Sequence, residues 1–378
     1  MDVGHTAGHS VDTILSPRFS EYYSNETVAL HYNYTGKLTS SRYHTGLRVH
    51  AIVFIIVCLF IILENLLVLI AIWKNSKFHK PMYYLLANLT LSDMLAGVAY
   101  MVNILLSGAN TLKLTPVLWF LREGGVFITL TASVFSLLAI AVERHVTMVR
   151  MQLYHTDKKC RTRLFVAADW IISVFLGSLP IMGWNCIRNL SECSTVLPLY
   201  SKNYILVCIL IFILILFAIV ILYVRIYRLV KCNSPMGGTS RNMVSRSQKY
   251  LALLKTVTIV VGTFIACWLP LFIVLLLDVS CTVGTCRILY KADYFLGLAM
   301  INSALNPIIY TLTSRDMRRA IVRLLCLTKD GEQARCCGIL VSECSTSQMD
   351  RSSHRHEPLH TTLSSGNGPQ SPTRTSVA

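Results

Sequence analysis

The sequence predicts an all-α membrane protein, a bundle of seven transmembrane helices followed by a short amphipathic helix. Of its 378 residues, 53% are hydrophobic and only 14% are charged, and the mean hydropathy is +0.54. Soluble domains carry about 25% charged residues. Seven apolar runs are each long enough to cross the ~30 Å hydrocarbon core of a bilayer as a helix. A soluble chain is therefore excluded.

The seven runs define the domain organisation. We expect helices at about residues 50–73, 82–106, 124–148, 164–184, 204–227, 251–278 and 294–312. The transmembrane bundle thus occupies residues 50–313, after an N-terminal segment over residues 1–49. Because the number of spans is odd, the two ends of the chain are expected on opposite sides of the membrane.

Lysine and arginine gather in the loops after the first, third and fifth runs. The positive-inside rule places such loops in the cytosol. They contain Lys74, Lys77, Lys80, Arg150, Lys158, Lys159, Arg161, Arg163, Arg228, Lys231, Arg241, Arg246 and Lys249. These positions lie between apolar runs, so the net charge of +16 does not indicate a nucleic-acid-binding face. We expect a plasma-membrane protein with its N-terminus outside and its C-terminus in the cytosol.

The N-terminal segment fits an extracellular position. It carries glycosylation sequons at Asn25 and Asn33. It has no apolar core of the signal-peptide kind, so we expect the first span to direct membrane insertion. A third sequon, at Asn189, lies close to two cysteines in the loop after the fourth run, and the sequence leaves its use open.

Two pairs of cysteines fall in outer loops. Cys186 and Cys193 share one loop, and Cys281 and Cys286 share another. Because only the outer compartment is oxidising, we expect each pair to form a disulfide. Each closed loop is short, so its main effect is to fix the shape of the loop at the mouth of a site.

The chain after the seventh run begins with an amphipathic stretch over residues 314–326. Apolar side chains share one helical face and arginines lie largely opposite, which predicts a helix on the inner leaflet. The cysteines that follow, Cys326, Cys336 and Cys337, are either palmitoylated or free cytosolic thiols. Residues 327–378 are rich in serine and threonine and are expected to be disordered, with phosphorylation sites around Ser345, Ser352, Thr361 and Ser371.

A charged side chain inside a bilayer is costly and therefore indicates a function. Asp93 lies mid-span in the second run, where Ser133, Asn302, Ser303 and neighbouring polar residues can surround it. This set is either a hydrogen-bonded core network or a site for a sodium ion. Asp169, in the fourth run, has no role in this scheme.

Four motifs in order resemble those of rhodopsin-like G-protein-coupled receptors. They are Glu143-Arg144-His145, Trp170, Cys267-Trp268-Leu269-Pro270, and Asn306-Pro307-Ile308-Ile309-Tyr310. The resemblance implies that Arg144, Tyr223 and Tyr310 line a site for a G protein. Two positions depart from the family, because Trp119 stands where most members have cysteine and Ile215 where most have proline. The usual disulfide to the third helix cannot form, which fits a separate Cys186–Cys193 pair.

The outer mouth carries a charged pair above an apolar stripe. Arg122 and Glu123 are adjacent and so lie ~100° apart on a helix, and we expect them to face one ligand rather than each other. A guanidinium binds phosphate bidentately and a carboxylate prefers an ammonium group, with Lys37 as a second cation. The stripe below consists of Phe127, Leu130, Trp268, Leu271, Phe272 and Leu275.

These features predict a zwitterionic ligand with one long apolar tail. Two plainer interpretations remain open. Arg122 and Glu123 can be an interfacial pair that reaches toward lipid headgroups. The aromatic and leucine stripe can be ordinary helix packing.

Segments around the mouth resemble sphingosine 1-phosphate receptors, most of all subtype five. They are residues 31–38, 119–124, 183–186 and 193–200. The resemblance implies that Tyr32, Lys37 and Arg122 hold the phosphate and Glu123 the ammonium. It also implies that Asn103 and Asp293 assist at the rim, and that inhibitory-type G proteins, arrestin and receptor kinases are partners.

The alternative functions are a receptor for lysophosphatidic acid and a membrane transporter or lipid enzyme. Lysophosphatidic acid receptors are relatives whose ligand lacks an amine, and glutamine replaces the position of Glu123 in them. Glu123 therefore favours the amine-bearing lipid. A membrane transporter or lipid enzyme is disfavoured, because the sequence has neither internal repeats nor a nucleophile–base pair or metal set in its spans. We expect no enzymatic activity.

Overall fold

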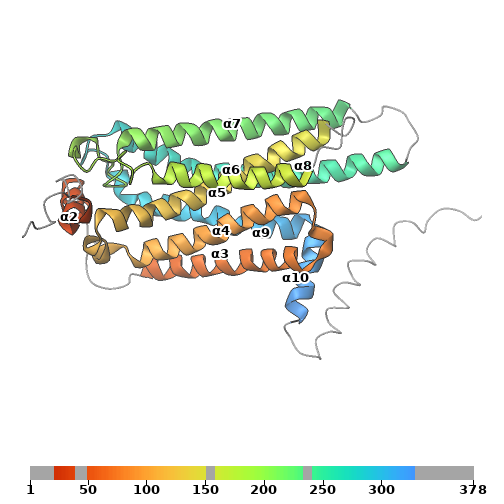
Figure 1. The fold of residues 1–378 in the computed structure, drawn as a ribbon, viewed down its shortest axis with the longest axis horizontal. Coiled ribbons are helices and arrows are strands. Elements are labelled where there is room, and N and C mark those ends of the chain that lie inside the picture. The colour runs from red at the N-terminus through yellow and green to blue at the C-terminus, as the bar shows by residue number, and fades with distance from the viewer. Residues whose placement is uncertain (1–20, 39–48, 150–157, 233–240, 328–378) are drawn as a thin grey trace, which may run out of the picture. The chain divides into compact units, whose positions relative to one another are not determined.

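In the part of the chain that the structure describes, seven long helices form a bundle in which they lie side by side (Figure 1). The computed structural model describes residues 21–38, 49–149, 158–232 and 241–327. The bundle consists of α3 (Val49–Lys74), α4 (Pro81–Leu105), α5 (Pro116–Val149), α6 (Lys158–Ser178), α7 (Lys202–Cys232), α8 (Arg241–Ser280) and α9 (Ala292–Thr313). The predicted all-α seven-helix fold is confirmed.

Shorter helices lie before, between and after these seven. They are α2 (Asn25–Tyr34), η3 (Ser76–Phe78), η4 (Gly108–Lys113), η6 (Leu190–Glu192), η7 (Arg287–Lys291) and α10 (Arg315–Leu327). One compact unit ends at Leu324 and contains all of these elements except the last residues of α10. We call the end of the bundle at which α5 begins, and where α2 lies, the lid end, and the opposite end the far end.

Of the seven bundle helices in the described residues, six are long and apolar enough to cross a membrane. The remaining helix, α6, is shorter and carries Arg161, Arg163 and Asp169 among its 21 residues. It nevertheless packs against α4 and α5 as part of the bundle. Its charges, rather than its position, distinguish it from the other six.

Several predicted helix boundaries were wrong. The third helix, α5, begins at Pro116 instead of residue 124, and proline is favoured at the first position of a helix. The fourth helix, α6, ends at Ser178 instead of residue 184, because Pro180 disfavours helical backbone just before it. The fifth helix, α7, ends at Cys232 instead of residue 227, and the sixth helix, α8, begins at Arg241 instead of residue 251. Both extend beyond the apolar runs that predicted them.

The helix α5 forms the centre of the bundle and packs against α4, α6 and α7, while α9 packs against α8 and α3. Close approach requires a glycine at one of these contacts. A Cβ atom on Gly177 of α6 would lie 2.4 Å from the side chain of Ile128 on α5. Substitution of Gly177 would therefore force the two helices apart.

The proline in α9 is accommodated by a side chain from α3. Pro307 lacks an N–H group, so the carbonyl of Ser303, four residues earlier, loses its helical donor. The amide nitrogen of Asn65 donates to that carbonyl at 3.2 Å. Buried backbone groups in a membrane must be satisfied within the protein, and Asn65 supplies this partner.

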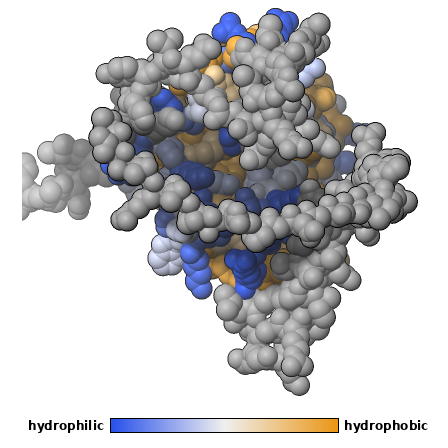
Figure 2. All heavy atoms as spheres, turned by 90° about the vertical axis from the view of Figure 1, so that its right-hand side faces the viewer, coloured by the Kyte–Doolittle hydropathy of each residue, from blue (hydrophilic) through white to orange (hydrophobic). Residues whose placement is uncertain are grey.

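The far end of the bundle combines polar helix ends with the amphipathic helix. Figure 2 faces this end, where hydrophilic side chains gather in the part that grey atoms leave visible and apolar ones lie around them. In α10, Met317 is buried against the bundle and Ile321 and Leu324 are partly buried, whereas Arg319 and Arg323 are exposed. The predicted amphipathic helix is thus confirmed.

Candidate functional site

A cavity of about 780 Å³ opens at the lid end of the bundle. Residues of α2, α3, α4, α5, α7, α8 and α9 line it, together with η4, η7 and the loop that precedes α7. The cavity is lined by all twelve residues that sequence analysis assigned to headgroup and tail, namely Tyr32, Lys37, Asn103, Arg122, Glu123, Asp293, Phe127, Leu130, Trp268, Leu271, Phe272 and Leu275. The residues that the sequence assigned to headgroup and tail therefore line one cavity.

Arg122 and Glu123 pair with each other, contrary to the sequence-based expectation. Arg122 Nη2 lies 2.6 Å from Glu123 Oε1. The expectation considered only the ~100° between adjacent positions on a helix, but the long guanidinium side chain can bend back across that angle. The side chains are 4% and 14% exposed, so the pair is largely shielded from water.

Other bonds fix the Arg122 guanidinium at the cavity wall. Its Nη1 donates to the carbonyl of Leu106 at 2.8 Å and to the hydroxyl of Thr111 at 2.9 Å. Its Nε has no hydrogen-bond partner in the described structure. Arg122 thus presents a held cation with one N–H still available to a ligand.

The hydroxyl of Tyr32 joins helix α2 to α5 beside this pair. Trp119 Nε1 donates to Tyr32 Oη at 3.0 Å, which gives a role to the tryptophan that stands where most receptors of the resembled family have cysteine. Burial raises the pKa of Tyr32 and raises that of Tyr200 well above its ordinary value. Both phenols therefore stay protonated and can donate hydrogen bonds at neutral pH.

Lys37, Asn103 and Asp293 complete the polar part of the lining. The ammonium of Lys37 donates to the carbonyl of Val196 and lies 6.0 Å from the ring centre of Tyr32. Asn103 is half-buried on α4, and Asp293 is exposed in the first turn of α9. Positive and negative groups thus both face the same end of the cavity.

Aromatic rings line the deeper, apolar part. Phe212 of α7 lies between Phe127 and Phe272, with ring centres 6.1 and 6.0 Å away. Trp268 follows, with its ring centre 5.7 Å from that of Phe272. These side chains pack against one another and also line the cavity. Ordinary packing and a ligand-binding role are therefore compatible for the same stripe.

Sequence reasoning missed several cavity residues. They are Tyr100, Val196, Leu197, Tyr200, Tyr204, Phe212 and Met300. The hydroxyl groups of Tyr100 and Tyr200 are buried and have no hydrogen-bond partner in the described structure. A buried tyrosine normally finds a partner for its hydroxyl, so these two are further candidates for contact with a polar ligand group.

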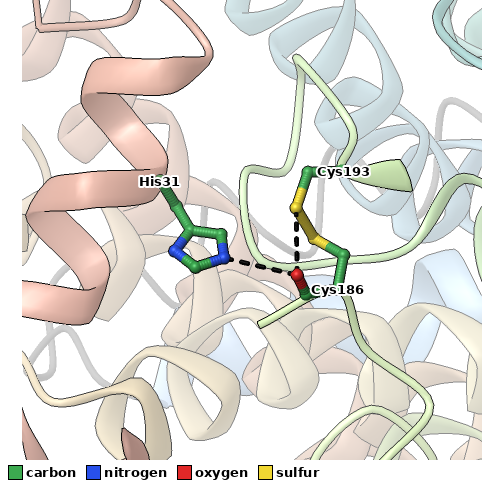
Figure 3. A group of neighbouring side chains, drawn as sticks. All are labelled: His31, Cys186 and Cys193. Carbon is green, nitrogen blue, oxygen red and sulfur yellow. Dashed lines mark hydrogen bonds between the residues drawn. A yellow bond between two sulfur atoms is a disulfide. The ribbon is translucent and has the colours of Figure 1, made fainter. Parts of the chain in front are cut away.

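The loop before α7 contains the first predicted disulfide, and both predicted disulfides are present. Cys186 is bonded to Cys193, and Cys281 to Cys286. Figure 3 shows the His31 ring of α2 pointing at the first disulfide, with Nε2 3.4 Å from the carbonyl oxygen of Cys186. The other ring nitrogen lies 2.7 Å from the carbonyl of Thr27. His31 thus connects α2 to the loop over the cavity.

His31, Cys186 and Cys193 lie close enough together to resemble a metal site. A metal would need cysteine thiolates as ligands. Both sulfur atoms are instead bonded to each other (Figure 3). The cluster is therefore a structural contact between α2 and the loop.

Comparisons with known proteins identify the family. Residues 64–310 match the family described as 7 transmembrane receptor (rhodopsin family). The chain is 54% identical to sphingosine 1-phosphate receptor 1 of Danio rerio, over 91% of this chain and 98% of that protein. It is 56% identical to receptor 3 of Takifugu rubripes and 55% identical to receptor 5 of Homo sapiens, each over 80% of this chain and 78% of the relative.

The chain belongs to the sphingosine 1-phosphate receptor family. This membership excludes the transporter and enzyme alternatives, because the family consists of receptors. Subtypes one, three and five match at nearly equal identity. The assignment to subtype five therefore stays a prediction.

In the middle of the receptor, Asp93 accepts three hydrogen bonds. Ser133 and Ser303 donate to its Oδ1 at 2.9 and 3.0 Å, and Asn306 donates to its Oδ2 at 2.8 Å. The side-chain oxygens of Asn302 and Asn306 are buried without a partner. The predicted core network is therefore present, and unpartnered oxygens remain beside it.

The structure gives Asp169 a role that the sequence did not. Its Oδ2 accepts from Asn88 at 2.6 Å and from Ser136 at 2.8 Å. Trp170 donates to the amide oxygen of Asn88 at 2.9 Å. This network joins α4, α5 and α6 inside the receptor and places Asn88, part of a sequon, out of reach of glycosylation.

Replacing Asp169 by alanine is expected to destabilise the receptor by about 2 kcal/mol, because Asn88 and Ser136 lose an acceptor where water cannot replace it. Thermal unfolding of the purified receptor in detergent would measure this as a lower midpoint. Asp169→Asn is the matched control, since one amide oxygen can still accept both bonds. An alanine variant as stable as the asparagine variant would contradict the assigned role.

At the far end of the receptor, Glu143 pairs with α6. Two guanidinium nitrogens of Arg161 donate to its carboxylate oxygens at 2.8 Å each, and Thr147 donates at 3.1 Å. Arg144, Tyr223 and Tyr310 lie toward the same end on α5, α7 and α9. Pro307 is buried within α9.

The predicted modification sites fall partly within the described structure. Asn25 and Asn33 are exposed on α2, as glycosylation requires. Asn189 is exposed too, but its side chain bonds to Ser191 and Glu192. Cys326 lies in the last turn of α10, and Cys336, Cys337 and the phosphorylation sites lie outside the described residues.

Proposed function

We propose that this receptor binds sphingosine 1-phosphate in the cavity at the lid end and transmits binding to heterotrimeric G proteins. The observation that carries the proposal is the arrangement of the cavity. Arg122 and Glu123 provide opposite charges at its polar part, and aromatic rings line its deeper, apolar part. A lipid with an ammonium near a phosphate and one long tail matches both parts.

The headgroup would exchange partners with the existing ion pair. Its phosphate would take the donors of Arg122, Lys37 and Tyr32, and its ammonium would bind the carboxylate of Glu123. The 2.6 Å pair already places both charges side by side, so binding requires little rearrangement. Asn103 and Asp293 would assist at the rim. The tail would lie along Phe127, Leu130, Trp268, Leu271, Phe272 and Leu275.

The proposed mechanism is a population shift. Ligand binds an active arrangement of helices more tightly, and tenfold tighter binding supplies about 1.4 kcal/mol toward it. The far ends of α7 and α8 then open a cleft for the G protein, which Arg144, Tyr223 and Tyr310 would line. Glu143, Asn306 and Pro307 would belong to the switch. We propose inhibitory-type G proteins as the main partners, with arrestin and receptor kinases at the tail.

We further propose that the receptor lies in the plasma membrane with α2 outside. Basic residues such as Lys74, Lys77 and Lys80 are exposed near the far end, whereas the disulfides and the sequons on α2 belong to the lid end. Glycans on Asn25 and Asn33 and palmitoylation of Cys326, Cys336 and Cys337 are part of the same proposal.

A sodium ion is proposed beside Asp93. The residues fit such an ion, because a hard cation prefers oxygen ligands and the side-chain oxygen of Asn302 is buried without a partner. Asp93, Ser133, Asn302 and Ser303 would hold it. Bound sodium would supply a positive charge between α4, α5 and α9 and favour one helix arrangement.

Asp93→Asn is expected to remove the effect of sodium on agonist affinity. In the unchanged receptor, replacing choline chloride by sodium chloride should lower that affinity by about threefold, because the ion stabilises the inactive arrangement. Competition binding in the two salts would measure both values. A sodium effect that persists in Asp93→Asn would contradict the site.

A GTP-exchange assay tests the proposed function. Membranes that contain the full chain and a heterotrimeric G protein should exchange GTP faster when sphingosine 1-phosphate is added. Lysophosphatidic acid is the matched lipid, since it carries a phosphate and a tail but no amine. Equal stimulation by both lipids would favour the lysophosphatidic acid alternative, and stimulation by neither would contradict the proposal.

A further inference from the structure

Asp278 is a fully buried carboxylate near the end of α8, outside the residues discussed above. Both of its oxygens accept hydrogen bonds from the loop before α7. Oδ2 accepts from the hydroxyl of Ser194 at 2.5 Å, and Oδ1 accepts from the backbone N–H of Thr195 at 2.9 Å. A helix side chain thus holds one corner of the loop.

That corner is folded around the hydroxyl of Ser194. While it donates to Asp278, the hydroxyl also accepts from the backbone N–H of Leu197 at 2.8 Å. The N–H of Ser194 donates to the carbonyl of Tyr200 at 3.0 Å. The carboxylate therefore fixes a compact turn, Ser194–Leu197, instead of a single contact.

This turn forms part of the cavity wall. Val196 and Leu197 line the cavity, and the carbonyl of Val196 accepts the hydrogen bond from Lys37. The chain of contacts runs from Asp278 through the turn to Lys37, which the proposed function assigns to the phosphate. The side chain of Asp278 does not line the cavity itself.

Asp278 also shares a helical face with the ligand-tail stripe. It lies three residues after Leu275 and seven after Leu271, spacings that place side chains on the same side of a helix. Both leucines line the cavity. One helix therefore contacts the deep part of the cavity directly and its polar part through the loop.

We propose that Asp278 is a positioning residue for the ligand headgroup, which clamps the Ser194–Leu197 turn so that Val196 holds Lys37 over the phosphate. The inference rests on the proposed function. It adds a residue that does not line the cavity itself and that couples α8 to the Ser194–Leu197 turn.

Asp278→Ala is expected to weaken binding of radiolabelled sphingosine 1-phosphate to membranes containing the full chain by about tenfold, because a buried charge-assisted clamp is lost. The affinity of Asp278→Asn should stay within about threefold of that of the unchanged receptor, since an amide can accept from Thr195 and donate to Ser194. Glu192→Gln, which removes an exposed charge from the same loop, should bind normally.

A double-mutant cycle with Lys37→Ala separates positioning from general loss of packing. If Asp278 acts through Lys37, then Asp278→Ala should weaken binding by less than about twofold once Lys37 is alanine. Independent effects would instead multiply. Multiplied losses would overturn the proposal, even if each single variant binds more weakly.

The outcomes distinguish this inference from the proposed function. Failure of the unchanged receptor to bind the lipid contradicts the function, whereas normal binding by Asp278→Ala overturns only the inference. If too little Asp278→Ala reaches the cell surface, Ser194→Ala replaces it, because it removes the same bond from the loop side. Normal binding by Ser194→Ala would likewise overturn the clamp.

Discussion

Arg122→Ala is expected to weaken sphingosine 1-phosphate binding by more than about a hundredfold. Alanine removes the guanidinium that would bind the phosphate bidentately, a charge-assisted contact stronger than a neutral hydrogen bond. It also removes the cation that lies 2.6 Å from the Glu123 carboxylate, which is then unpaired in a largely shielded position. Saturation binding with radiolabelled lipid on membranes would measure the change.

Arg122→Lys is the matched control for this prediction. Lysine keeps the charge but has a single nitrogen, so it cannot form the fork in which one nitrogen donates to Leu106 and Thr111 and the other to Glu123. We expect a loss of about tenfold, between the unchanged receptor and the alanine variant. Normal affinity in Arg122→Ala, at normal surface expression, would show that the phosphate binds elsewhere.

The fold could be predicted because a bilayer restricts what a chain can do. Apolar runs of about 20 residues must form helices there, since every backbone group needs an internal partner. The helix ends were less predictable. The α5 helix begins at Pro116 and α6 ends at Ser178, and both ends depend on turn chemistry rather than on hydropathy.

The residues that line the cavity could be predicted, but the contacts between their side chains could not. Residue chemistry placed Arg122, Glu123 and Lys37 at one mouth, and the structure has all three lining one cavity. The pair between Arg122 and Glu123 depends on how far a side chain bends, which helical angles do not describe. Lys37 contacts Val196, which is 159 residues away in the sequence.

The carboxylates show the same limit. Asp169 could not be explained from the sequence, because its partners Asn88 and Ser136 belong to two other helices. Asp278 looked like the end of an apolar run, although it binds a loop 83 residues earlier. A buried charge in a membrane helix signals that a partner exists. Only the packed structure identifies that partner.

Glu123→Gln should separate binding of sphingosine 1-phosphate from binding of lysophosphatidic acid. We expect sphingosine 1-phosphate to bind about tenfold to a hundredfold more weakly, because a neutral amide cannot form a charge-assisted bond to an ammonium. Lysophosphatidic acid has no ammonium, so its affinity should change little. Competition binding with both lipids on the same membranes would give the two ratios.

Asp293→Asn makes the same change of charge at the rim and serves as the control for Glu123→Gln. Because Asp293 is exposed, water screens its charge, and we expect only a small loss. Glu123 is 14% exposed and already holds a cation, so its charge acts at close range. Equal losses for both lipids in Glu123→Gln would mean that Glu123 acts only by holding Arg122, and that the amine is recognised by another group.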